Sequence, residues 1–253
     1  MTPWQIPIYL IIFLYGIVIG SFLNVCIYRI PQKESIAKER SHCMSCGYQL
    51  KWYDLIPLGS YLFLGGKCRK CKKHIPLQYP LIEAANGILY VIIFLVNGMD
   101  AVSVIYCLMT SALLVLSVID VRSYEIPLGI NVFILVLGLI RLALDYSNWS
   151  NYVIGFSVIS LCLEILLLLS RGKAIGGGDV KLMAAAGLIL GWKLIILAFV
   201  WACILGSVLH IIRMKISHAP HVLAMGPYLS MGIFLAALWG EPFINWYLNM
   251  ILR

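Results

Sequence analysis

The sequence predicts an all-α polytopic membrane protein of about eight transmembrane helices, with a small polar domain inserted between the first two. Composition is the first reason: of 253 residues, 62% are hydrophobic and 12% are charged, about half the charged fraction of an ordinary soluble domain. The mean hydropathy of +0.93 is the second. The third is that the apolar residues gather into runs of helical length, so the bilayer is the expected solvent for most of the chain.

Eight apolar runs cover residues 4–28, 81–97, 101–119, 127–144, 151–170, 180–192, 194–212 and 222–240. The sixth run is short for a bilayer crossing, so we expect it to tilt or to enter the membrane only in part. A single long polar insertion separates the first two runs, and the other connections are short. We therefore expect a first transmembrane helix (1–28), a polar domain (29–80) and a seven-helix membrane core (81–253).

The formal charge of +8 follows membrane topology and does not indicate a nucleic-acid partner. When successive loops are assigned to alternate sides of the membrane, sixteen of the nineteen Lys and Arg residues fall on the side of residues 29–80. Basic loops are retained in the cytoplasm. The sequence therefore predicts an external amino terminus and a cytoplasmic polar domain.

Two aspartates fall at the predicted cytoplasmic boundary, where Asp120 ends the third run and Asp179 begins the sixth. An acid at the edge of a membrane helix is costly to desolvate, so it usually has a partner or a task. Three glycines precede Asp179 and allow backbone conformations closed to other residues. Gly176, Gly177 and Gly178, with Lys181, thus form a candidate loop for the approach of a substrate chain.

Two carboxyls that share one proton can hydrolyse a peptide bond, because the protonated acid polarises the carbonyl and the ionised acid activates water. The sequence does not assign these roles within a coupled pair. Structural roles stay open, in which Asp120 pairs with Arg122 or a neighbouring cation and Asp179 caps its helix. A proton-coupled transporter with a relay through Glu164 is the alternative from another functional class, and a non-enzymatic assembly factor is a third.

Four of the eight cysteines form two Cys-x-x-Cys pairs in the polar segment, Cys43 with Cys46 and Cys68 with Cys71. Tetrahedral zinc takes four thiolates, which two such turns supply. The spacing predicts a closed, structural zinc site, with free thiols or a redox pair as alternatives. Because a short polar segment cannot build a large core, the metal would contribute directly to its folding.

Several motifs, in order, resemble the type IV prepilin peptidase family. The family's opening signature is similar to Gly20-Ser21-Phe22-Leu23-Asn24-Val25 and Tyr28-Arg29-Ile30-Pro31. Its cytoplasmic domain is similar to residues 52–58, 66–68 and 79–83, and its closing block is similar to Gly226-Pro227-Tyr228-Leu229. Asp120 and residues 176–182 occupy the two catalytic blocks. Met225 stands where the family usually has Phe. The similarity runs from about residue 16 to residue 232.

The resemblance implies an intramembrane aspartyl endopeptidase that removes the basic leader of type IV prepilins or pseudopilins, at the cytoplasmic face of the bacterial inner membrane. Such proteins serve pilus assembly, protein secretion or DNA uptake. It also implies that Asp120 and Asp179 are catalytic and that the four cysteines bind zinc. Many members methylate the new amino terminus with S-adenosylmethionine, which points to the region of Asn24, Arg29 and Glu83. The expected partners are the prepilin substrates and the lipid bilayer.

Overall fold

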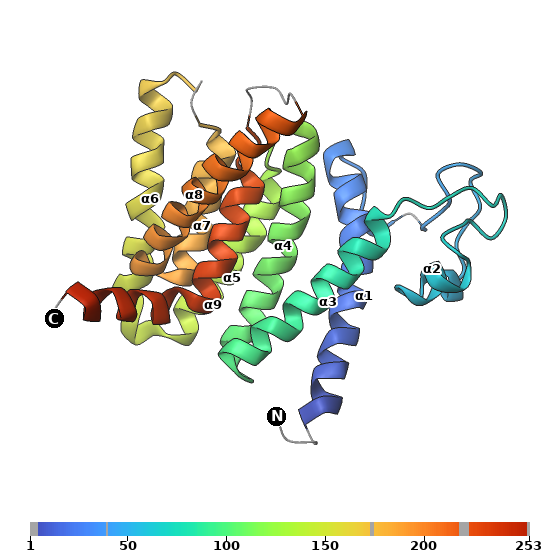
Figure 1. Ribbon diagram of the computed structural model, residues 1–253, viewed down its shortest axis with the longest axis horizontal. Helices are drawn as coiled ribbons and strands as arrows, with labels where there is room; N and C mark the ends of the chain where they lie inside the picture. Colours follow the sequence, from blue (N-terminus) through green and yellow to red (C-terminus); the bar gives the residue numbers. More distant parts are fainter. Residues whose placement is uncertain (1–4, 39, 173–174, 218–222, 252–253) are drawn as a thin grey trace. The chain divides into compact units, whose positions relative to one another are not determined.

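The computed structural model describes residues 5–38, 40–172, 175–217 and 223–251, and these residues form helices and turns without a β-strand. Each of the eight predicted apolar runs coincides with one long helix (Figure 1), although residues 4 and 222 at the edges of two runs lie outside the described residues. Among the described residues, five helices are long and apolar enough to cross a bilayer: α1, α3, α4, α6 and α8. The all-helical membrane class is confirmed, and eight crossings remain a prediction.

The chain divides into two compact units, Met1–Met99 and Asp100–Arg253. The first contains α1 (Gln5–Gln32), η1 (Trp52–Leu55), α2 (Gly59–Phe63) and α3 (Gln78–Asn97). Helix α3 therefore shares a unit with the polar segment, whereas the sequence analysis divided the chain at residue 80. The functional domains 1–28, 29–80 and 81–253 stay a prediction.

Glycines allow the two long helices of the first unit to pack closely. A Cβ atom on Gly16 would lie 2.6 Å from the Cα of Gly87, and one on Gly20 would lie 2.7 Å from the Cα of Glu83. Membrane helices use small residues four apart for such contacts, since lipid supplies no hydrophobic drive between helices. One turn beyond Gly20, the side-chain amide of Asn24 donates to the carbonyl of Tyr79 at 3.1 Å. The packing of α1 on α3 thus positions Asn24 at the start of α3.

The second unit contains six helices: α4 (Ala101–Ser123), α5 (Leu128–Leu144), α6 (Trp149–Leu169), α7 (Gly177–Leu190), α8 (Trp192–Ser217) and α9 (Gly226–Ile251), with the short turn η2 (Tyr146–Asn148) before α6. Helix α7 packs against α5, α6, α8 and α9, and residues 182–190 are all buried. Its 14 residues span about 21 Å, which is less than the ~30 Å of a hydrocarbon core. The short sixth run is therefore a central helix enclosed mainly by its neighbours (Figure 1).

Candidate functional site

Asp120 lies near the end of α4 and is buried, with 5% of its surface exposed. Its Oδ2 accepts a hydrogen bond of 2.8 Å from the amide of Gly226, the first residue of α9. A Cβ atom on Gly226 would lie 2.8 Å from that same oxygen, so only glycine fits against the carboxylate. Asp120 is thus held by a segment more than one hundred residues away in the chain.

Asp179 lies in the first turn of α7 and is only partly buried. Residue Gly176 is extended (φ −78°, ψ 140°), and the helix begins at Gly177. The expected loop before Asp179 therefore does not include Gly177 and Gly178, because both residues belong to the helix. A role of these glycines in the approach of substrate stays a prediction. Packing explains why residue 178 is a glycine, because a Cβ atom on it would lie 2.8 Å from the Cβ of Ile126.

The two aspartates are close enough for the charge of Asp120 to act on the carboxylate of Asp179. The structure therefore brings together two acids that stand 59 residues apart in the sequence. Lys181, of the expected substrate-approach loop, is exposed on α7. Glu164 is exposed on α6 and is not enclosed with the pair, which argues against a relay of buried acids through these three residues.

The contact between Gly226 and Asp120 predicts a strong effect of Gly226→Ala. The new methyl group must displace the carboxylate, and a misplacement of about 1 Å at a catalytic group can cost on the order of 10²-fold in rate. We expect the prepilin cleavage that the resemblance implies to fall about 100-fold with the protein still inserted in the membrane, measured with a purified prepilin. Gly240→Ala is the matched control, because its methyl group would mainly displace the terminal methyl of Leu194 and none of its nearest neighbours belongs to Asp120. Equal losses in both variants would contradict this account.

The helical start of α7 predicts that Gly178→Val abolishes cleavage by forcing α7 away from Ile126. Among the described residues, a Cβ on the neighbouring Gly177 would have one neighbour within 4 Å, Leu167 at 3.8 Å, so Gly177→Val is expected to retain at least half of the activity. Both variants are compared in the same prepilin assay, with membrane insertion checked by fractionation. Loss of cleavage in Gly177→Val as well would assign the glycines to the approach of substrate and not to packing.

The four cysteines of the polar segment converge in the first unit, with all four sulfur atoms within 4.8 Å of one another. Each pair lies in a turn closed by an isolated antiparallel bridge, His42 with Gln49 and Lys67 with His74. Cys43 and Cys71 are 3.9 Å apart at sulfur, and Cys46 and Cys68 are 4.0 Å apart. Four thiolates at ~2.3 Å from one tetrahedral zinc lie about 3.8 Å from each other. The donor set and its dimensions therefore fit zinc.

The local backbone favours ionisation within this cluster. The amides of Cys71 and Lys70 lower the pKa of the Cys68 thiol to about 6. The amide of Tyr48 acts in the same direction on Cys46, but desolvation and hydrogen bonds to the other thiols raise the pKa of Cys46 to about 11. The Cys68 thiolate therefore forms readily, and a bound cation would favour ionisation of its other thiol ligands as well.

A salt bridge ties the segment between the two cysteine pairs to the second pair. Asp54 of η1 is buried and accepts from the Nε of Arg69 at 2.7 Å. The same carboxylate accepts from the amide of Lys51 at 3.2 Å. Arg69 also lies over the ring of Tyr53. These contacts bring the second turn of cysteines against η1 and compensate for the small apolar core of the segment.

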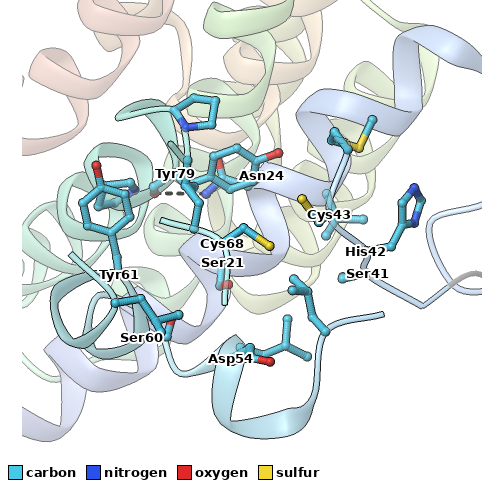
Figure 2. Close-up of a pocket in the computed structure, with 18 of the residues that line it drawn as sticks. Ser21, Asn24, Ser41, His42, Cys43, Asp54, Ser60, Tyr61, Cys68 and Tyr79 are labelled. Carbon is cyan, nitrogen blue, oxygen red and sulfur yellow. Dashed lines mark hydrogen bonds between the residues drawn. The ribbon is translucent and has the colours of Figure 1, made fainter. Parts of the chain in front are cut away.

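A cavity of about 230 Å³ lies between this segment and the adjoining ends of α1 and α3. Asn24, Arg29 and Glu83 all line it and are all buried, so the structure brings together the three residues that the resemblance grouped only by region. Figure 2 shows Asn24 bonded to Tyr79, with Cys43 and Cys68 also drawn along the cavity. The cavity therefore adjoins the cysteine cluster.

The polar side chains that line this cavity differ in their hydrogen-bond partners. Glu83 accepts hydrogen bonds from the amide of Leu58 at 2.7 Å and from the hydroxyl of Ser21. Arg29 donates to the carbonyl of Ser35 at 3.1 Å. Within the part of the chain that the structure describes, the buried Oδ1 of Asn24 has no hydrogen-bond partner. Because a buried acceptor without a partner costs about 1–3 kcal/mol, this oxygen is suited to a donor on a bound ligand.

Comparison with known proteins bears on both units. A sequence model of the bacterial peptidase A24 amino-terminal domain matches residues 14–97, and a model of the type IV leader peptidase family matches residues 107–211. A prepilin leader peptidase/N-methyltransferase of Bacillus subtilis is 30% identical over 96% of this chain and 98% of its own length. The chain belongs to the type IV leader peptidase family.

Other relatives of this family with the same description agree over a similar extent. The protein of Aeromonas salmonicida is 29% identical over 99% of this chain and 96% of its own length. That of Pseudomonas aeruginosa is 30% identical over 93% and 92%. No solved structure matches. As a member of the type IV leader peptidase family, the chain is an enzyme, a membrane-embedded peptidase.

Two contacts of the candidate peptidase site escaped the sequence analysis. The resemblance included Gly226 in the closing block but gave it no role. Asn131 was not singled out, although it is a lone amide in the apolar run 127–144, and its Nδ2 donates to the carbonyl of Gly178 at 3.2 Å. A polar residue within an apolar run was the available signal, since such residues are expensive in a membrane helix.

Proposed function

We propose that this enzyme is an aspartyl endopeptidase that removes the basic leader of type IV prepilins or pseudopilins, with Asp120 and Asp179 as the catalytic pair. The observation that carries the proposal is the electrostatic interaction between these two carboxylates in a chain of the leader peptidase family. The names of the relatives supply the substrate class.

The pair can perform the hydrolysis without another cofactor. Two carboxylates at short range cannot both ionise cheaply, so one proton is shared between them. The ionised acid takes a proton from water, and the water oxygen bonds to the scissile carbonyl carbon while the protonated acid donates to its oxygen. The carbon–nitrogen bond then breaks: the acid that took the proton from water gives it to the leaving amine, and the other acid takes a proton back from a hydroxyl of the tetrahedral intermediate, which restores the shared proton.

The depth of the pair suits a substrate whose leader is basic and whose mature segment is apolar. Asp120 lies near the end of α4, a helix able to cross the membrane, and Asp179 lies at the start of α7. Both acids are therefore expected at the interface, where water is available. The distribution of Lys and Arg favours the cytoplasmic side, where anionic lipids can neutralise the basic loops.

We further propose that the first unit holds a structural zinc ion at Cys43, Cys46, Cys68 and Cys71 and transfers a methyl group to the new amino terminus. S-adenosylmethionine would supply an electrophilic methyl group. In the adjoining cavity, Arg29 can pair with a ligand carboxylate, Glu83 can oppose a cationic centre, and the free Oδ1 of Asn24 can accept from an ammonium or amino group. A closed tetrathiolate site leaves no open position on the metal, so zinc would hold the fold and not act on substrate.

The test is co-expression with a prepilin, followed by the intact mass of the mature pilin. Loss of the leader mass identifies the endopeptidase, and an additional gain of one CH₂ group identifies the methyl transfer. Asn24→Leu and Glu83→Gln variants are expected to give a cleaved but unmethylated product. An uncleaved precursor with the wild-type enzyme would refute the peptidase assignment, and normal methylation in both variants would refute the cavity assignment.

A further inference from the structure

We infer that Asn131 is a substrate-binding residue of the peptidase site, whose side-chain oxygen accepts a main-chain N–H of the bound prepilin next to the scissile bond. The inference rests on the proposed peptidase function and adds a contact to it. Asn131 lies in the first turns of α5 and is 4% exposed. Its Nδ2 donates to the carbonyl of Gly178, the residue before Asp179, at 3.2 Å.

The contact with Gly178 fixes the orientation of the amide. A carbonyl oxygen can only accept, so the atom of Asn131 that faces it must be the nitrogen. The Oδ1 is then the atom left over, and it is buried without a hydrogen-bond partner among the described residues. The side-chain amide of Asn131 therefore does two things. Its nitrogen holds the first turn of α7 next to Asp179, and its oxygen is the acceptor that lacks a partner among the described residues.

A buried acceptor with no partner costs about 1–3 kcal/mol, so its position in the fold calls for a donor supplied from outside. A leucine of similar size would fill the same volume without that cost. The hydroxyl of Thr110 is also buried without a partner, but a hydroxyl can rotate onto a carbonyl of its own helix. The planar amide of Asn131, anchored through its nitrogen, has no such freedom.

The chemistry of the donor follows from the reaction. The substrate offers main-chain N–H groups on both sides of the bond to be cut, and a peptide held in extended form must pair these groups with acceptors. The first turn of an α-helix presents N–H groups and not acceptors. Asn131 thus supplies an acceptor next to Asp179 that α7 itself cannot supply.

The experiment is a double-mutant cycle in which protein variants are combined with ester-substituted substrates. Purified enzyme in lipid nanodiscs cleaves a series of synthetic prepilin segments in which single main-chain N–H groups flanking the scissile bond are replaced by an ester oxygen. At one position the ester is expected to lower kcat/KM of the wild-type enzyme about 10-fold. In Asn131→Leu and Asn131→Ala, kcat/KM with the normal segment falls by a similar factor, and the same ester has no further effect.

Thr110→Val is the matched control, because it removes another buried, unpartnered polar group of the same unit and should retain the full ester penalty. Two variants of Asn131 are used so that one failing to fold leaves the other to decide. If the wild-type enzyme cleaves the segments but every ester costs the variants as much as the wild type, Asn131 does not bind substrate and the inference is overturned. If the wild-type enzyme cleaves no segment at all, the proposed function itself has failed.

Discussion

Asp120→Asn and Asp179→Asn are each expected to lower prepilin cleavage by about 10³-fold or more, within the range of 10²–10⁴ that one acid–base group contributes and with loss of the shared proton in addition. An amide cannot take a proton from water, nor give one to the leaving amine. The effect should appear in kcat, since neither substitution changes the volume of the site. Initial rates with a purified prepilin, over a range of enzyme concentrations, measure it.

Asp145→Asn is the matched control for these variants. Asp145 also lies at a helix end of the second unit, and it accepts hydrogen bonds from Tyr152 and Asn148. It directly follows the last residue of α5, about 21 Å along the helix from Asn131. We expect its variant to cleave at a rate within twofold of wild type. Cleavage by Asp120→Asn or Asp179→Asn at a comparable rate would exclude the proposed catalytic pair.

Removal of the metal ligands is expected to have the second largest effect, confined to the first unit. The apparent free energy of zinc binding in small structural sites is about 10–16 kcal/mol, far more than the short polar segment can replace by burial of apolar surface. In a Cys68→Ser, Cys71→Ser double variant we expect loss of one tightly bound zinc per chain and loss of methylation. Metal content by mass spectrometry and the mass of the mature pilin measure the two effects.

Cleavage should fall much less than methylation in that variant, because Asp120 and Asp179 both belong to the second unit. Cys162→Ser, in the exposed face of α6, is the control and should keep both zinc and methylation. Retention of stoichiometric zinc in the double variant would place the metal elsewhere. Loss of cleavage in proportion to methylation would mean that the two units do not act separately.

The sequence alone was sufficient for features that depend on short-range pattern. Apolar runs gave the positions of all eight long helices, because the length and composition of a helix in lipid are set locally. The two Cys-x-x-Cys turns indicated four thiols that could share one metal ion, and their sulfur atoms do converge. The glycines before Asp179 predicted a loop, but Gly177 and Gly178 are helical, and the sequence did not reveal that Ile126 is the neighbour of Gly178.

Tertiary structure alone decided which groups complete each site. Three hydrogen bonds link segments that are distant in the chain: Gly226 donates to Asp120, Asn131 donates to the carbonyl of Gly178, and Leu58 donates to Glu83. No local pattern specifies them. The same holds for the helical start of α7, where packing against α5 prevails over the conformational freedom of glycine. Local interactions fix where helices begin and end, whereas the energy of burying and pairing polar groups depends on neighbours that only the assembled bundle supplies.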